Sequence, residues 1–318
     1  MISPGRLWWL FRRDLKRGWA ATYHDYITLP LIREWSGHDF PKASWNVPVH
    51  VLTGRNDWQL AAWMLASWFE FSGAAWPVFI HDDGAIPEEG RAIFHKLFPS
   101  VCIISRKEAD EKMDILLRPF PHCHSYRNEH ALSLKIFDFT MLTPGERFLV
   151  FDSDILFFQR PHELLDVIAS GAEGCWFNED VAEGALITAA EARDKLGFEI
   201  WPRVNSGLGF VNKSAIDLNL CEQALAQTSI LKGHIWCIEQ TLYMLCAARF
   251  GKGGLLPRRY EVSLEKDAAR DAVCRHYVGA VRNRFYAEGL KRLRDQLLPS
   301  AHARRPQGEA SANPSPLP

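Results

Sequence analysis

Three patterns that would assign a sequence to a class at once are missing from these 318 residues. No apolar stretch approaches the roughly 20 residues that span a lipid bilayer. Charged side chains such as Arg6, Arg12 and Asp14 interrupt the N-terminal region, so we expect no secretory leader. The formal net charge is −1, which gives no overall positive field and argues against a nucleic-acid partner. We also find no internal repeat.

Cysteine is present but without a pattern. There are seven cysteines, an odd number, and no two are spaced Cys-x-x-Cys. Such a set predicts reduced thiols rather than a disulfide framework or a zinc site. We therefore expect a cytoplasmic protein.

What the sequence does contain is a regular alternation of strand and helix patterns. Short apolar runs rich in β-branched and aromatic residues predict strands at 47–53, 77–81, 101–105, 148–151, 175–177 and 204–212. Longer periodic runs predict helices at 58–71, 87–98, 131–142, 161–169, 215–228 and 239–250. Repeated β-α-β units indicate an α/β fold, with a mostly parallel central sheet and helices on both of its faces.

Two terminal segments flank the predicted domain, which spans residues 47–298. Residues 1–46 are basic and aromatic. They either pack on the domain as a helical extension, which we favour, or make peripheral contact with a membrane surface. Residues 299–318 are rich in Pro, Ser, Ala and Arg and are expected to be a disordered tail.

The most informative feature is a pair of acids, Asp152 and Asp154, between the apolar runs 148–151 and 155–158. The pair follows a predicted strand, and open α/β sheets bind ligands at the carboxyl ends of their strands. Two carboxylates in apolar surroundings are costly unless a partner offsets their charge. A divalent cation that prefers oxygen ligands is such a partner. Asp-x-Asp is also common in ordinary turns, so other residues must decide between the two readings.

Further motifs follow along the chain in the order of a known family. They are Thr53, Asp57, Asn205-Ser206-Gly207, Glu239-Gln240 and a late His276-Tyr-x-Gly. Together with the acid pair they resemble the GT-A nucleotide-sugar glycosyltransferases of the glycogenin and lipopolysaccharide galactosyltransferase type, glycosyltransferase family 8. The resemblance covers about 47–293, most of the chain. It implies a Rossmann-like GT-A fold.

The resemblance also implies a set of site residues. Asp152, Asp154 and His276 would bind Mn²⁺, or Mg²⁺, against the diphosphate of the donor. The implied donor-binding residues are Thr53, Asp57, Lys135, Asp152, Ser153, Ser206, Gly207 and Arg282. Asn205, Glu239 and Gln240 are implied as catalytic residues around the transferred sugar. The family's Lys-Pro-Trp is absent after His276, and Arg282 or Arg284 would replace its lysine.

Ordinary structural roles compete with several of these assignments. Asp57 precedes a helix and would also serve as its N-cap. Lys135 lies on an otherwise apolar helical face, from which its ammonium group would reach solvent. Glu239 would lie in the first turn of a helix, where the dipole favours an acid. His276 taken alone would be a core or surface histidine.

The acceptor is expected to be selected by residues 106–130 and 179–203, which carry no recognisable motif. Within the first segment we predict a loop at 118–128. Its polar side chains would line an acceptor cleft or a solvated loop; they are Arg118, His122, His124, Arg127 and His130.

The predicted function is that of a metal-dependent glycosyltransferase. The donor would be a nucleotide-linked sugar, with UDP favoured by the resemblance, and transfer would retain the anomeric configuration. The acceptor would be a saccharide, a lipid-linked molecule or a protein. One alternative is a catalytically inactive GT-A-like binding protein. Another is an Asp-x-Asp phosphatase or phosphotransferase, which is disfavoured because Leu156 stands where such enzymes carry Thr or Val.

Overall fold

The computed structural model of the chain describes residues 8, 11, 12, 15, 22–35, 40–44 and 46–298. The predicted tail, 299–318, lies outside the described residues, as does much of the N-terminal segment.

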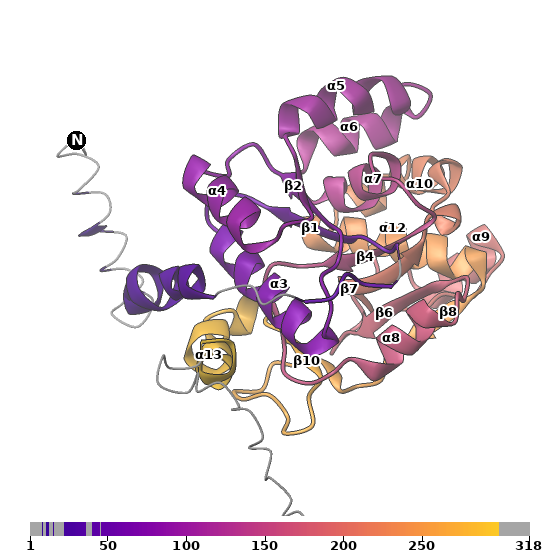
Figure 1. The fold of residues 1–318 in the computed structure, drawn as a ribbon. Helices are drawn as coiled ribbons and strands as arrows, with labels where there is room; N and C mark the ends of the chain where they lie inside the picture. Colours follow the sequence, from indigo (N-terminus) through magenta and orange to yellow (C-terminus); the bar gives the residue numbers. More distant parts are fainter. Residues whose placement is uncertain are drawn as a thin grey trace, which may run out of the picture.

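A seven-stranded sheet forms the centre of the molecule, with the strand order β3-β2-β1-β4-β7-β6-β8 (Figure 1). Its strands are β1 (Val49–Thr53), β2 (Val78–Asp82), β3 (Val101–Ile104), β4 (Arg147–Phe151), β6 (Cys175–Glu179), β7 (Val204–Asn212) and β8 (Gly253–Leu255). The strands from β3 to β4 are parallel to one another, and β7 runs against both of its neighbours. The mostly parallel sheet predicted from the sequence is confirmed.

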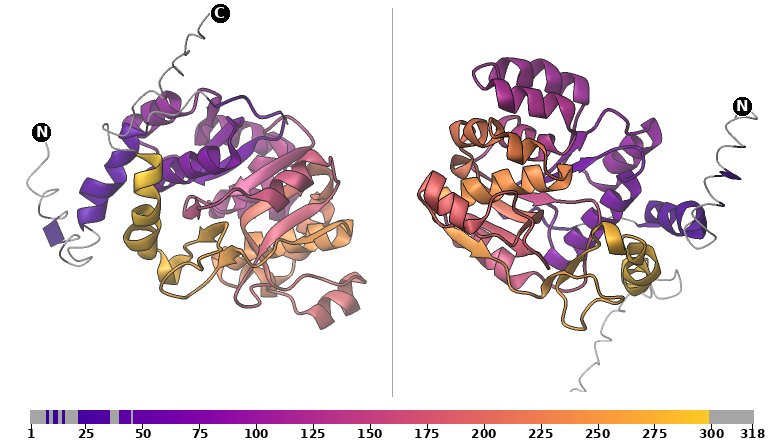
Figure 2. Two further views of the ribbon diagram at one scale, coloured as in Figure 1. Left: turned by 60° about the horizontal axis from the view of Figure 1, so that its bottom comes forward. Right: turned by 180° about the vertical axis from the view of Figure 1, so that it is seen from behind.

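Helices cover both faces of this sheet (Figure 2). One core holds side chains of α3 (Trp58–Ser72), α4 (Glu88–Leu97), α8 (His162–Ala169) and α13 (Lys291–Leu297). The other holds side chains of α5 (Arg106–Leu116), α6 (Pro121–Glu129), α7 (Ser133–Met141), α9 (Ala189–Leu196), α10 (Leu218–Leu225), α11 (Thr228–Leu231) and α12 (Ile235–Phe250).

The apolar strand β4 explains how one sheet serves two cores. Its side chains alternate between faces, as the two-residue period of a strand requires. Leu149 and Phe151 enter the core with α3, whereas Phe148 and Val150 enter the core with α7 and α12. A run that is apolar on both faces is typical of a central strand, and β4 lies between β1 and β7.

A second, three-stranded sheet was not predicted from the sequence. It consists of β5 (Ile155–Phe157), β10 (Cys274–His276) and β9 (Tyr260–Val262), in the order β5-β10-β9. Strand β10 is antiparallel to β5, with His276 opposite Ile155. The backbone N–H of Tyr277 donates to the Asp154 carbonyl at 2.9 Å. This pairing brings the C-terminal part of the chain to the acid pair.

Several boundaries differ from the sequence prediction. The loop expected at 118–128 is wrong, because α6 occupies 121–129 and begins with Pro121, a residue suited to the first helical turn. Its buried residues Cys123, Tyr126 and Arg127 hold it against the domain, which a short polar sequence does not reveal. Helix α12 begins at Ile235, before the predicted start at 239.

The N-terminal segment packs on the domain from His24 onward. It forms the short helices η1 (His24–Thr28) and η2 (Leu29–Glu34). Leu29 and Ile32 are buried in the core with α3, and the Trp63 indole donates to the Leu29 carbonyl at 3.1 Å. Membrane contact through residues 1–46 and a cytoplasmic location remain predictions. Among the described helices, none combines the length and apolar character needed to cross a bilayer.

Candidate active site

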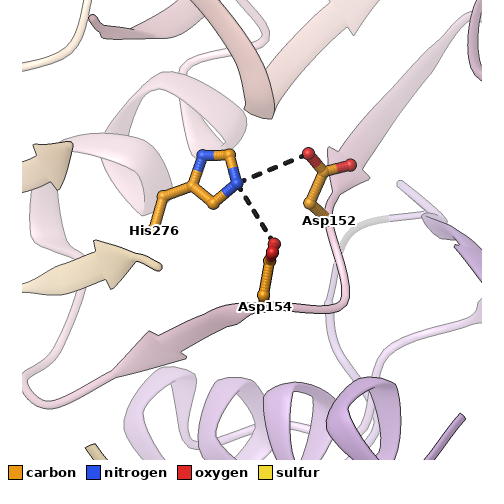
Figure 3. Close-up of side chains that lie close together, drawn as sticks. All are labelled: Asp152, Asp154 and His276. Atoms are coloured by element: carbon orange, nitrogen blue, oxygen red, sulfur yellow. Dashed lines mark ion pairs between the residues drawn. The ribbon is translucent and has the colours of Figure 1, made fainter. Parts of the chain in front are cut away.

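Asp152, Asp154 and His276 converge at the end of β4 (Figure 3). The Nε2 atom of His276 lies 3.1 Å from Oδ1 of Asp154 and 3.5 Å from Oδ2 of Asp152. One potential ligand atom from each residue lies within 4.8 Å of the other two. The structure therefore brings together the three residues that the sequence motifs assign to a metal ion.

Strand pairing explains why these side chains meet. The backbone N–H of Asp152 donates to the Gly207 carbonyl at 2.7 Å, which continues the β4–β7 ladder to the acid pair. Asn205, Ser206 and Gly207 of β7 therefore lie beside the acids, as the motif order predicts. His276 reaches them from the other side through the pairing of β10 with β5.

The charges of the cluster stabilise one another. Burial alone would lower the pKa of His276, but the carboxylates of Asp154 and Asp152 outweigh it and raise that pKa above its ordinary value. Burial alone would raise the pKa of Asp154, yet His276 and the Arg282 guanidinium hold it below its usual range. Without a metal ion the imidazole thus acts as the counter-ion of the acids.

Lys135 joins the cluster from α7. Its ammonium group lies 2.8 Å from Oδ1 of Asp152 and 3.4 Å from Oε1 of Glu239, and its side chain is 3% exposed. The alternative in which the Lys135 ammonium group reaches solvent is wrong, because α12 packs against α7 and the side chain is enclosed. Burial by itself would lower the pKa of Lys135, but the two carboxylates raise it. The lysine is therefore a buried cation in the site.

Glu239 is the most deeply buried acid of the site. It lies in the second turn of α12, so the alternative of an acid in the first helical turn is wrong. Its Oε2 accepts a hydrogen bond from the Ser206 hydroxyl at 2.9 Å. Burial and the Asp152 charge outweigh the attraction of Lys135 and raise the pKa of Glu239 to about 7.

Of the two arginines that the sequence left open, Arg282 lies at the acid pair. Its guanidinium lies 2.9 Å from Oδ1 of Asp57 and 3.5 Å from Oδ2 of Asp154. Arg284 instead pairs with Asp267, away from the acid pair. Asp57 does occupy the N-cap position of α3, but its side chain makes no capping hydrogen bond. Its carboxylate pairs with Arg282 instead.

Asn205 bridges His276 to an acid that the sequence did not single out, Asp180. The Asn205 Oδ1 atom lies 2.9 Å from Nδ1 of His276, and its Nδ2 donates to Oδ2 of Asp180 at 2.8 Å. Gly207 lies directly beneath the imidazole, where a Cβ would overlap the His276 ring. Asp180 follows β6 in a segment with no motif, so only the tertiary structure identifies it.

Two adjoining cavities meet at the cluster. A cavity of about 600 Å³ lies on the side of β7 and α12, and one of about 230 Å³ lies at the ends of β1 and β4. The residues that line both are Leu132, Lys135, Asp152, Asp154 and Arg282. The predicted residues that line only the larger are Asn205, Ser206, Gly207, Glu239, Gln240 and His276. Those that line only the smaller are Thr53, Asp57 and Ser153.

Of the two segments expected to select an acceptor, one lines a cavity through several residues, whereas the predicted polar residues of the other line neither cavity. Asp180, Ala182 and Gly184 of 179–203 line the larger cavity, and so does Trp236, which is 68% exposed. The polar residues predicted in 106–130 line neither cavity. Arg127 is fully buried in an ion pair with Asp138 at 2.8 Å, so it belongs neither to a cleft nor to a solvated loop.

The donor set fits a divalent cation. Two carboxylates and one imidazole nitrogen suit Mn²⁺, which accepts both oxygen and nitrogen ligands. The Nδ1 atom of His276 faces an amide oxygen and must therefore carry the proton, which leaves the lone pair of the neutral ring on Nε2. That atom faces both acids.

No protein-family model and no curated protein sequence matches the chain. Solved structures do. Galactosyltransferase LgtC in complex with donor and acceptor sugar analogues is 15% identical, with a TM-score of 0.50 over 82% of this chain and 98% of LgtC. An active-site mutant of LgtC is 14% identical, with a TM-score of 0.50 over 73% of this chain and 88% of the mutant. Mouse xyloside xylosyltransferase 1, in its apo form, is 11% identical, with a TM-score of 0.49 over 74% and 98% of the two chains.

Identities this low show the fold alone. The chain therefore has the GT-A fold of these glycosyltransferases.

Proposed function

We propose that this protein is a metal-dependent glycosyltransferase that uses a UDP-linked sugar and retains its anomeric configuration. The observation that carries the proposal is the position of Asp152, Asp154 and His276 where two cavities meet. A metal ion held there would contact a diphosphate that joins a nucleoside in one cavity to a sugar in the other. The likeness to LgtC in fold supports this arrangement.

The smaller cavity suits the nucleoside. The Thr53 hydroxyl is buried, and among the described residues it has no hydrogen-bond partner, so a base or ribose would satisfy it. Asp57 and Asp83 add carboxylates that accept hydrogen bonds from ribose hydroxyls or from the N–H of uracil. Ser153, which stands between the two acids in the sequence, also lines this cavity.

The larger cavity suits the transferred sugar and the acceptor. Its polar lining includes Ser206, Gln240 and Asp180, which offer hydrogen bonds to hydroxyl groups. Trp236 adds an exposed aromatic face at the cavity. We take the acceptor to be a saccharide, which the LgtC complex with donor and acceptor sugar analogues supports.

Charge stabilisation and positioning account for the chemistry. A bound Mn²⁺ would supply neutralisation of the donor diphosphate and so make it a better leaving group. Lys135 and Arg282 line both cavities and bring two further positive charges to the same place. Both cations are already held by carboxylates, so little reorganisation is needed when a phosphate arrives.

The engagement of the remaining carboxylates supports retention without a covalent intermediate. Asp180 is held by Asn205, and Glu239 is held by Lys135 and Ser206. Neither is placed as a free nucleophile, which disfavours a covalent glycosyl-enzyme intermediate. The departing phosphate is then the base for an acceptor hydroxyl that attacks from the same face.

The test is a thermal-shift and hydrolysis panel of UDP-, GDP- and CMP-sugars with added Mn²⁺. We expect UDP release from a UDP-sugar, its loss on chelation, and a fall of about 100-fold or more in Asp152→Asn and Asp154→Asn. Asp114→Asn is the matched control, because Asp114 is an exposed acid of α5 that pairs with His124. Failure of every donor to bind or react would reject the proposal.

The same panel, extended by a phosphomonoester, separates the two alternatives. A donor-dependent thermal shift without turnover would identify a binding protein. Phosphate release from a phosphomonoester would identify a phosphatase.

A further inference from the structure

We propose that Asp180 and Asn205 are positioning residues that fix the orientation and tautomer of His276. They would keep its Nε2 atom aimed at Asp152 and Asp154 and ready to bind a metal ion. The inference uses the metal of the proposed function but concerns a different group of atoms, on the far side of the imidazole. It gives Asn205 a role other than contact with the sugar, and it adds Asp180 to the site.

The direction of each hydrogen bond in the series that links Asp180, Asn205 and His276 is determined. The Asp180 carboxylate accepts hydrogen bonds, so the Asn205 group that faces it, at 2.8 Å, must be the NH₂. The Oδ1 of Asn205 then faces the backbone N–H of Gly207 at 3.1 Å and Nδ1 of His276 at 2.9 Å. Because an amide oxygen only accepts, Nδ1 of His276 carries a hydrogen. In the neutral ring Nε2 is left with its lone pair.

Burial makes this arrangement rigid. Asn205 and His276 are both buried, at 5% and 6% exposure, and all of the Asn205 side-chain polar atoms are engaged. A Cβ at position 207 would lie 2.9 Å from Oδ1 of Asn205 and would overlap the imidazole. Glycine at 207 therefore leaves the space in which the ring and the amide meet.

Asp180, at the other end of this hydrogen-bond series, is also held in place. The backbone N–H of Asp180 donates to the Arg203 carbonyl at 2.7 Å, and the Arg203 guanidinium donates to the Asp180 carbonyl at 2.6 and 2.9 Å. Oδ1 of Asp180 accepts from the backbone N–H of Val181 at 2.7 Å. Its Oδ2 is left to face Asn205. A register shift of β6 against β7 after Phe177 places Asn178 opposite Asn205, two residues before Asp180.

A carboxylate behind a metal-binding histidine raises the basicity of the ring and fixes its tautomer, and loss of such partners commonly costs 10- to 100-fold in metal affinity. Here the effect would pass through the amide of Asn205. We therefore expect the larger effect at Asn205 and a smaller one at Asp180.

The test compares Asn205→Ala and Asp180→Ala with Glu183→Ala, which removes an exposed acid three residues after Asp180. Imidazole ¹⁵N chemical shifts of the metal-free protein report whether Nδ1 of His276 carries a hydrogen and donates it to Asn205, with His276→Gln for assignment. Electron paramagnetic resonance of free Mn²⁺ reports affinity. We expect a changed Nδ1 resonance and weaker Mn²⁺ binding, by about 10- to 100-fold in Asn205→Ala and several-fold in Asp180→Ala. Glu183→Ala should match the wild type.

Asp180→Ala keeps the proposal testable if Asn205→Ala fails to fold, because Asp180 lies outside the central strand β7. A wild-type Nδ1 resonance in Asp180→Ala together with wild-type Mn²⁺ affinity would overturn the proposal. If the wild type binds no Mn²⁺, the proposed function fails. The Nδ1 measurement still decides whether Asp180 and Asn205 position the ring.

Discussion

Lys135 and Asp152 form an ion pair of 2.8 Å inside the site, with the lysine side chain 3% exposed and the aspartate side chain 29% exposed. The same ammonium group faces Glu239, which is buried. One cation thus compensates two acids that approach it from different elements. Removal of that cation should therefore lower the free energy of unfolding of the protein, whatever its effect on catalysis.

We expect Lys135→Met to lower the free energy of unfolding by about 3 kcal/mol at neutral pH, because it leaves Glu239 buried without its cation. Urea denaturation with a chelator present measures this value. Lys107→Met, at an exposed position of α5, should change stability by less than about 0.5 kcal/mol. Equal stability of both variants would show that the buried pair contributes nothing.

Glu239 should make the protein less stable as the pH rises. The pKa of its carboxyl is raised to about 7 in the folded protein, chiefly by burial, from a usual value of 4.5. The folded state therefore binds more protons than the unfolded state between these values, and stability falls as the pH rises through that window. Glu239→Gln has no carboxyl to titrate, so its free energy of unfolding should not fall in this way. The difference in the free energy of unfolding between Glu239→Gln and the wild type should therefore shift in favour of the variant by about 2–3 kcal/mol between pH 4.5 and 7. Urea unfolding across this range tests it, and a constant difference would contradict it.

A buried pair of histidines, His50 and His81, should make the protein more stable as the pH rises, which is the opposite of the effect of Glu239. Their ring nitrogens lie 3.0 Å apart between β1 and β2, and burial lowers the pKa of His81 to about 3. The folded state then binds fewer protons than the unfolded state, so this contribution is complete above about pH 6.5 and is lost as the pH falls toward 3. His81→Leu should retain about 2 kcal/mol more of its neutral-pH stability at pH 5 than the wild type does. His95→Leu, at an exposed position of α4, is the control and should follow the wild type.

Gly207→Ala should weaken Mn²⁺ binding, because the added methyl group takes the space of the His276 ring. We expect a loss of about 10-fold or more in affinity by titration calorimetry. Gly254→Ala is the matched control, since a Cβ there meets no atom within 4 Å. Wild-type affinity in Gly207→Ala would mean that the ring moves aside freely.

Arg282→Ala should raise the KM for a UDP-sugar by about 10-fold or more, because a guanidinium that faces phosphate typically contributes over 1 kcal/mol. Arg284→Ala tests the register, since Arg284 pairs with Asp267 at the surface and should leave the donor KM unchanged. The reverse result would assign the phosphate contact to Arg284.

The sequence predicted the fold and part of the site for clear physical reasons. The apolar flanks of Asp152 and Asp154 marked the end of a buried strand, and the alternation of strands and helices predicted a mostly parallel sheet. His276 was found only through the resemblance, because nothing local marks a histidine that reaches its partners by pairing β10 with β5.

Other contacts depend on packing that a single sequence does not encode visibly. Lys135 meets Glu239 only because α7 packs against α12. Asp180 reaches Asn205 through a register shift of β6 against β7, and no motif announces it. Arg127 lies in a segment that reads as polar and loop-like, yet it is buried. In each case a polar residue pairs with a residue of another element.

The small sheet has a consequence for when the site becomes complete. Asp152 is bonded to the large sheet through the Gly207 carbonyl, whereas the imidazole reaches the acids only when β10 pairs with β5. A chain that ended before β10 would hold two like charges and no third ligand. If the proposed function holds, metal binding is coupled to the pairing of β10 with β5, and a bound ion should slow the local opening of β10 in hydrogen exchange.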